Sequence, residues 1–300
     1  MMEGMLRPER LPKVRVLHVN LRAEEAALLP TLPTTTLHGA LGYALRKVDP
    51  DAHRDLIEPP AAAGDLAGVT TRPPLPMVIA PRAPTGSRPF ELPAGGWLSV
   101  RCVLMGEKAC RHEGSLVAAL WRLAESGLGR QTQGWEHARF SVAEFDSAAA
   151  WPADAPLPIW QRLELRLETP LRLKAGGRVV SSIDAEALWG SLLRRGDQLA
   201  RCYGSGALVE GEPACPFEVL EAELRVQDVR RHSARQGRGM SWPGLLGRVT
   251  LGALAGRGEP GNRALELLRF VELAQLGKGT SFGFGRIKVK ALALSGPTGP

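Results

Sequence analysis

The chain of 300 residues has few cysteines, few aromatic residues and no long hydrophobic run. Its four cysteines form no Cys-x-x-Cys pair and have no histidine at zinc-finger spacing, so we expect reduced thiols and no zinc site. No apolar stretch reaches the length of a membrane span, and residues 1–15 lack the apolar core of a signal peptide. These absences predict a cytoplasmic protein with no membrane association. Because no cluster of acidic residues and histidines has ligand spacing, we also expect no metal and no cofactor.

An excess of acidic charge is also missing, and the basic excess is unevenly distributed. Residues 1–157 hold 17 basic and 17 acidic residues, whereas residues 158–300 hold 21 basic and 14 acidic residues. The net charge of +7 therefore belongs to the second half. This distribution favours a polyanion-binding face on the second half. The alternative is that the arginine content reflects genome composition.

Glycine is concentrated in one stretch near the end of the chain, with four glycines in residues 277–285. The cationic and hydroxyl side chains between them suit a loop whose backbone approaches an anion closely. Apolar periodicity predicts a helix over residues 262–275 before this loop and a strand over 287–291 after it. The stretch is not a P-loop, because Glu272 and Gly279 stand where that motif needs a glycine and a hydroxyl. A glycine-rich hairpin without a ligand is the alternative.

Arginine is concentrated in residues 225–248, which hold six arginines against one acid, Asp228. His232 and Trp242 lie among these arginines. A solvated charged loop would explain such a run taken alone. The nearby glycine stretch favours phosphate contact instead.

The pattern of predicted elements is the same in the two halves. The first half has predicted strands at 16–21, 75–79, 97–105 and 139–145, and predicted helices at 37–47 and 115–126. The second half has a predicted strand at 163–167, a basic hairpin tip at 174–178, a helix at 185–195 and a strand at 217–226, before the final helix and strand described above. The first half therefore reads β-α-β-β-α-β, and the elements predicted in the second half follow the same order.

Two separate elements repeat at the same offset. Gly42 aligns with Gly190, and Gly129 aligns with Gly277, each pair 148 residues apart. So long a period indicates a duplicated domain, and a proline-rich linker at 148–158 separates the copies. We predict an α+β protein of tandem ferredoxin-like (RRM-like) domains with antiparallel sheets, at residues 1–156 and 157–300.

The stretch at 277–286 resembles the C-terminal glycine-rich loop of the CRISPR-associated endoribonucleases that cut precursor guide RNA, the Cas-six family of the RAMP superfamily. Residues 231–236, which read Arg-His-Ser-Ala-Arg-Gln, are similar to a segment that precedes a glycine-containing strand in one branch of that family. The resemblance implies tandem ferredoxin-like domains and an RNA-binding surface made by two groups of residues. The first group is Arg225, Arg230, Arg231, His232, Ser233, Arg235, Gln236 and Arg238, and the second is Gly277, Lys278, Gly279, Thr280, Ser281, Gly283, Phe284, Gly285 and Arg286.

The resemblance also implies a catalytic histidine in the first-domain helix, which is His38 here. We expect His38 in the first turn of that helix, where the positive end of the helix dipole disfavours imidazolium and favours a base. Tyr43, Arg46 and Lys47 follow on the same helix and complete the candidate catalytic set. The related branch often has arginine at the position of His38 and tyrosine at that of His232, so an arginine-based site with Arg46 or the 230–238 cluster is the alternative.

Three functions are compatible with these patterns. The first is an endoribonuclease that cuts CRISPR repeat RNA without a metal, through attack of the RNA 2′-hydroxyl, leaving a 2′,3′-cyclic phosphate and a 5′-hydroxyl. The second is a non-catalytic RAMP subunit that holds guide RNA with other Cas proteins in an effector complex. The third is a nucleic-acid-binding or protein-interaction protein unrelated to CRISPR.

Overall fold

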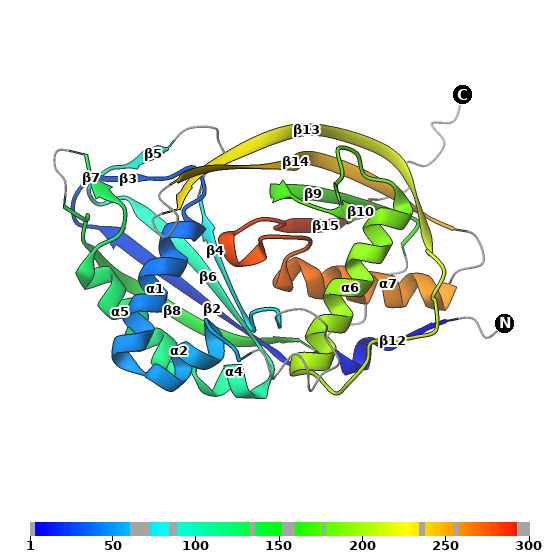
Figure 1. Cartoon of the computed structure of the whole chain (residues 1–300), viewed down its shortest axis with the longest axis horizontal. Coiled ribbons are helices and arrows are strands. Elements are labelled where there is room, and N and C mark those ends of the chain that lie inside the picture. Colours follow the sequence, from blue (N-terminus) through cyan, green and yellow to red (C-terminus); the bar gives the residue numbers. More distant parts are fainter. Residues whose placement is uncertain are drawn as a thin grey trace, which may run out of the picture.

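The computed structural model describes residues 4–60, 73–83, 89–132, 136–151, 160–175, 178–233, 238–254 and 258–292. For residues 175, 230–233, 238–240 and 258–260 the description concerns the backbone alone. The described residues form two α+β units that lie side by side, and a long hairpin of the second unit reaches over to the first (Figure 1).

The first unit is a four-stranded antiparallel sheet in the order β4-β6-β2-β8. Leu37, Leu41 and Leu45 form the buried stripe of its first helix, as their spacing predicts. In chain order the unit consists of β2 (Val14–Ala23), α1 (Thr34–Val48), β4 (Met77–Arg82), β6 (Trp97–Met105), α5 (Glu113–Ser126) and β8 (Phe140–Trp151).

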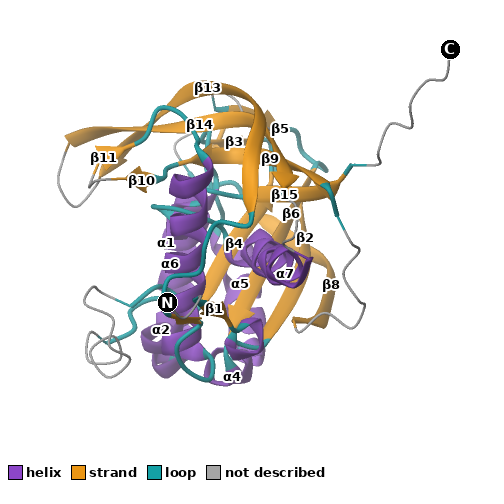
Figure 2. Ribbon diagram, turned by 90° about the vertical axis from the view of Figure 1, so that its right-hand side faces the viewer, coloured by secondary structure: helices purple, strands orange, loops and turns teal. Residues whose placement is uncertain are grey.

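The second unit repeats this topology in a sheet of order β13-β14-β9-β15. Leu163, Leu165 and Leu167 face its core, while Glu164 and Arg166 on the same strand point outward. In chain order the unit consists of β9 (Arg162–Leu171), α6 (Ala185–Tyr203), β13 (Phe217–Ser233), β14 (Arg238–Ala253), α7 (Gly258–Ala274) and β15 (Ile287–Ala291). Figure 2 shows α7 beneath β15 and the arch of β13 and β14 above.

Shorter elements complete the chain. A third, smaller sheet has the order β5-β3-β7. Two further strand pairs are formed by β1 with β12 and by β10 with β11. These elements are β1 (Met5–Leu6), the 3-10 helix η1 (Pro8–Arg10), β3 (Ala27–Leu29), α2 (Pro50–Leu56), β5 (Phe90–Leu92), α4 (Glu107–Arg111), β7 (Arg130–Gln131), β10 (Lys174–Ala175), β11 (Arg178–Val179), β12 (Val209–Glu210) and the 3-10 helix η2 (Thr280–Phe282).

The predicted tandem ferredoxin-like fold is confirmed, and each predicted helix and strand overlaps an observed one. The equivalence of the units extends to the glycines at the 148-residue offset. Gly129 follows α5 with φ +70° and Gly277 follows α7 with φ +81°. A Cβ on either would lie 2.8 Å from the carbonyl oxygen of Leu28 or 2.6 Å from that of Arg172. Glycine is therefore needed at the same turn of both units.

The alternative of a solvated charged loop at residues 225–248 is wrong, because β13 and β14 form a long hairpin that pairs from Phe217 with Ala253 up to Ser233 with Arg238. The first helix begins at Thr34, three residues before the predicted start at residue 37. The predicted boundary between residues 156 and 157 lies outside the described residues and stays a prediction.

One hydrophobic core joins the two units. Val16, Val103 and Met105 of the first sheet belong to the same buried cluster as the core of the second unit. Trp151 of β8 meets Phe270 of α7 at 5.7 Å between ring centroids. The face of the first sheet that its own helices leave open is therefore partly covered by α7, and relative motion of the units would expose apolar surface.

No helix in the part of the chain that the structure describes has the length and apolar character required to cross a membrane.

We predict that Trp151→Ala lowers the free energy of unfolding by about 3–5 kcal/mol, the range for removing a buried aromatic side chain. Because Trp151 joins the two units, the wild-type protein should also unfold in a single transition. Chemical denaturation followed by circular dichroism measures both. Trp121 is the matched control, since it is 47% exposed on α5, and Trp121→Ala should change stability little. Equal effects of the two substitutions would contradict the joined core.

Candidate nucleic-acid interface

The glycine-rich loop connects α7 to β15 and contains η2. Four of its glycines, at 277, 279, 283 and 285, have positive φ. Six of its backbone N–H groups donate to backbone carbonyl oxygens, including Lys278 N to Arg172 O at 2.9 Å and Gly285 N to Pro170 O at 3.0 Å. The loop is thus a folded element held by hydrogen bonds. Lys278, Gly279, Thr280 and Ser281 are exposed or half-buried, so the predicted anion-binding role fits these four best and stays a prediction.

Gly283 and Gly285 serve close packing inside the protein. A Cβ on Gly283 would collide with the side chain of Thr34 at the start of α1, and a Cβ on Gly285 would collide with the carbonyl oxygen of Leu276. Both glycines are buried. The sequence correctly indicated positions that exclude a side chain, but the surface that approaches these two in the structure is protein. Their role as RNA-binding residues stays a prediction. Gly277 has the same kind of protein neighbour in Arg172.

Phe284 belongs to a small core between the loop, the hairpin and the residues before α1. It is 1% exposed and clusters with Leu32 and Val229, with Trp242 and Phe282 packed against them. Burial gives Phe284 a packing role in the structure, and its role as an RNA-binding residue stays a prediction. Trp242 lies edge-on to Phe282 at 5.2 Å and tilted to Phe284 at 5.7 Å between ring centroids. This cluster holds the hairpin against the loop.

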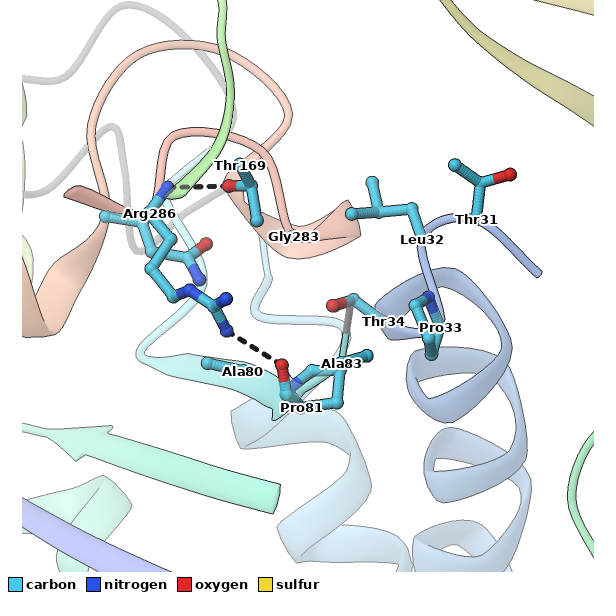
Figure 3. Close-up of a pocket in the computed structure, with 11 residues that line it drawn as sticks. Thr31, Leu32, Pro33, Thr34, Ala80, Pro81, Ala83, Thr169, Gly283 and Arg286 are labelled. Carbon is cyan, nitrogen blue, oxygen red and sulfur yellow. Dashed lines mark hydrogen bonds between the residues drawn. The ribbon is translucent and has the colours of Figure 1, made fainter. Parts of the chain in front are cut away.

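Arg286 joins the two units. Its Nη1 donates to the carbonyl oxygen of Pro81 at 2.7 Å, its Nε lies 2.9 Å from Glu168 Oε2, and its backbone N–H donates to Thr169 Oγ1 at 2.9 Å. Figure 3 shows the contacts with Pro81 and Thr169. Together with Arg286, Thr34 and Gly283 line the same cavity, which has a volume of about 10 Å³. The Arg286 side chain is 14% exposed. Its guanidinium thus contacts protein partners from both units, and its role as an RNA ligand stays a prediction.

His38 lies where α1 meets the glycine-rich loop. Its ring is half-buried and lies 6.0 Å from the ring of Phe282 in η2, at an interplanar angle of 49°. The expectation that it occupies the first helical turn is wrong, since α1 begins at Thr34 and His38 is in the second turn. The helix dipole acts mainly on the first turn, so the loop is the more important feature of its surroundings.

The other predicted catalytic residues do not gather around His38. Tyr43 and Lys47 lie about 140° and 180° around the helix from it, and Arg46 lies about 12 Å further along the axis. Tyr43 is 63% exposed, with the Lys47 ammonium 5.8 Å from its ring centre. Arg46 pairs with Glu58 at 3.5 Å. The structure therefore removes these three from a site centred on His38.

Other histidines with described side chains are held in different places. His53 is buried in α2, where burial lowers its pKa. His112 is 3.0 Å from Asp55, and His137 is 2.5 Å from the carbonyl oxygen of Gly129. His18 is exposed on β2. None of these four is positioned by the glycine-rich loop in the contacts described.

The arginine-rich segment forms the end of the β13–β14 hairpin. Arg230, Arg231, His232 and Ser233 close β13, and Arg238 opens β14. Arg235 and Gln236 lie outside the described residues. Val229, next to this end, packs with Leu32 just before α1. The hairpin therefore brings the arginine-rich end of the second unit to the start of the helix that carries His38 (Figure 1).

The open face of the second sheet carries a row of cations that the sequence analysis missed. In the antiparallel register Lys288 lies opposite Arg166, and Arg166 lies opposite Arg248. Like charges directly opposite each other destabilise a sheet. Arg248 pairs with Glu223 at 2.7 Å and Lys288 pairs with Glu272, while Arg166 is exposed. The alternation of charged and apolar residues in β9 and β15 indicated that the charged side chains share one face of each strand. The sequence does not show which residues of neighbouring strands lie opposite each other.

This row borders a hollow of about 750 Å³ on the same face. The predicted RNA-binding residue Arg225 is exposed and lines it. Its charged lining consists of Arg166, Arg225, Arg248, Arg286, Glu164, Glu168 and Glu223. Part of the basic excess predicted for the second half thus gathers on one open surface.

Within the described residues, no group of three or more histidine, cysteine, aspartate or glutamate side chains is arranged to hold a metal ion. The four cysteines are free thiols. Burial raises the pKa of Cys102 to about 12, which makes that thiol inert.

Comparison with known families agrees with this architecture. The family described as CRISPR-associated endoribonuclease Cas6 matches residues 165–287, and a second family model, described as an N-terminal domain, matches residues 11–171. The curated proteins contain no significant match to this chain.

Similar solved structures share the fold over nearly the whole chain. A product complex of Cas6 (TTHB231), a Thermus thermophilus protein, has a TM-score of 0.60 and 19% identity, covering 94% of this chain and 100% of that chain. A substrate mimic complex of Cas6 (TTHA0078) has a TM-score of 0.54 and 19% identity, covering 93% and 99%. A RAMP protein binding different RNA substrates has a TM-score of 0.55 and 12% identity, covering 92% and 99%.

The chain therefore shares the fold of these Cas6 and RAMP structures over nearly its whole length. Residues 165–287 are in addition similar to the family of CRISPR-associated endoribonucleases described as Cas6.

Proposed function

We propose that this protein cuts CRISPR repeat RNA into guide RNA, with His38 as the general acid or base. The observation that carries the proposal is the position of His38, whose ring meets Phe282 of η2 where α1 packs on the glycine-rich loop. A phosphate held by Lys278 and the segment 279–281 would lie on the same part of the loop as that contact. The proposed partners are repeat RNA and its guide product, together with other Cas proteins of an effector complex.

The proposed reaction uses a nucleophile that the substrate supplies. The 2′-hydroxyl loses its proton to a base and attacks the adjacent phosphorus in line, while the 5′-oxygen leaves and takes up a proton. The products are a 2′,3′-cyclic phosphate and a 5′-hydroxyl, with no added water. Charge develops on the phosphorane oxygens in the transition state, and cations near the cut stabilise it. The hairpin arginines are candidates for this role, because the backbone of β13 and β14 carries them toward α1.

RNA beyond the cut would follow the open face of the second sheet. Arg166 and Arg225 line the hollow on that face and are exposed. Phosphate contacts by such side chains contribute affinity that falls with salt. A RAMP subunit that only holds guide RNA would use the same face, so cleavage separates the two functions.

We predict that His38→Ala slows single-turnover cleavage of repeat RNA by about two to four orders of magnitude, the scale of losing a general acid or base. RNA affinity should change little, because the substitution leaves the arginines and lysines that contact phosphates in place. His18→Ala is the matched control, since His18 is an exposed histidine on β2. Wild-type rates for His38→Ala, with loss of cleavage on substituting Arg230 or Arg231, would move the site to the arginines.

A single 2′-deoxy nucleotide at the cut position should block cleavage and leave binding unchanged, because the attacking oxygen is removed. Cleavage of the all-RNA repeat should continue in excess EDTA, and the 5′ fragment should end in a cyclic phosphate. Mass spectrometry of the products identifies both termini. Cleavage of the 2′-deoxy substrate, or activity restored to a chelated protein only by magnesium, would contradict this mechanism. Tight binding with no cleavage under any condition would support the RNA-holding subunit.

We predict that Arg166→Ala and Arg225→Ala each weaken repeat RNA binding and reduce the slope of log affinity against log salt by about one. Arg122→Ala should leave the slope unchanged, since Arg122 is an exposed arginine on α5, away from the second sheet. Fluorescence anisotropy across a salt series measures these slopes. If all three variants share the wild-type slope, the RNA does not cross this face.

A further inference from the structure

Gln275 stands out in the backbone of the glycine-rich loop. It follows the last residue of α7, is 1% exposed and has φ +60°, the only positive φ outside glycine among the described residues. A left-handed conformation costs a non-glycine residue about 1–2 kcal/mol, and glycine usually occupies this position after a helix. The glutamine side chain must therefore contribute something that glycine lacks.

The side-chain amide of Gln275 bonds to the loop at the first residue of η2 and again just beyond its last residue. With its nitrogen toward the loop, it donates to Thr280 O at 2.9 Å and to Phe284 O at 3.2 Å. These carbonyls flank Phe282, which meets His38, and Gly283, which packs on Thr34. One buried side chain thus spans the segment of the loop that contacts α1.

Arg195 of α6 fixes Gln275 from the opposite side. Its Nε donates to the carbonyl oxygen of Gln275 at 3.1 Å and its Nη2 to that of Ala274 at 2.7 Å. The guanidinium is buried, and burial lowers the pKa of Arg195 to about 10, so it stays protonated at neutral pH. A cation at the C-terminal end of α7 satisfies helix carbonyls and opposes the helix dipole. Arg195 therefore fixes the backbone orientation of Gln275 through the carbonyl oxygens of Ala274 and Gln275.

We propose that Gln275, held by Arg195, is a positioning residue that sets the distance between η2 and the start of α1, and so the place of the RNA phosphate relative to His38. This inference rests on the proposed function. Gln275 touches neither RNA nor His38 and acts through the loop. A misplacement of about 1 Å at a reacting centre costs up to about 100-fold in rate.

Two variants separate the amide from the other properties of the residue. Gln275→Gly keeps the left-handed backbone and even favours it, but removes the amide. Gln275→Met keeps the side-chain length and removes both hydrogen bonds. If the residue were only a helix terminator, Gln275→Gly would cleave at the wild-type rate. We expect both variants to lower the saturating single-turnover rate by about 10- to 100-fold, with a smaller rise in the half-saturating RNA concentration.

A second readout needs no cleavage. Trp242 packs on Phe282 and Phe284, so a displaced η2 should shift its fluorescence, measured as the difference from the same variant carrying Trp242→Phe. Gln161→Glu is the control, because Gln161 is exposed before β9. Wild-type rates and unshifted Trp242 emission in both variants would overturn the proposal, as would a rate loss confined to Gln275→Met. If the wild-type protein cuts no repeat RNA, the proposed function fails, while the Trp242 signal still tests whether Gln275 sets the loop.

Discussion

The contact between Gly283 and Thr34 is the point on which the candidate site depends. It allows a loop of the second unit to lie directly on the first helix of the first unit, because no Cβ separates them. Without it, Phe282 and His38 would belong to separate domains with no fixed distance between them. The site is thus a property of the tandem arrangement and exists in neither unit alone.

Several other interactions keep that contact in place. The shared hydrophobic core and the Trp151–Phe270 contact resist separation of the units, and Arg286 ties the end of the loop to the carbonyl oxygen of Pro81. On the opposite side, Trp242 of the hairpin packs on Phe282 and Phe284 of the loop, and the guanidinium of Arg172 lies 5.3 Å from its ring. A rigid junction of this kind suits a reaction that needs in-line geometry more than strong chemical groups.

The repeated topology could be predicted well, because a buried face requires leucine at regular spacing and the same turn requires glycine in both units. Less of the candidate site could be predicted from the sequence. His38 and Phe282 are 244 positions apart, and their meeting depends on how two units pack, which no period reveals. The glycines were recognised as special, but whether protein or ligand fills the space beside Gly285 depends on the fold. The left-handed Gln275 had no sequence signal, since its residue type normally avoids that conformation.

The most direct test of the account is the structure of the protein with repeat RNA that carries a 2′-deoxy nucleotide at the cut. The account predicts the scissile phosphate at the junction of α1 and η2, within hydrogen-bonding distance of His38 and beside residues 278–281. It also predicts Gly283 still packed on Thr34. A scissile phosphate on the face of α1 that carries Tyr43 and Lys47, or a loop lifted away from Thr34, would contradict it.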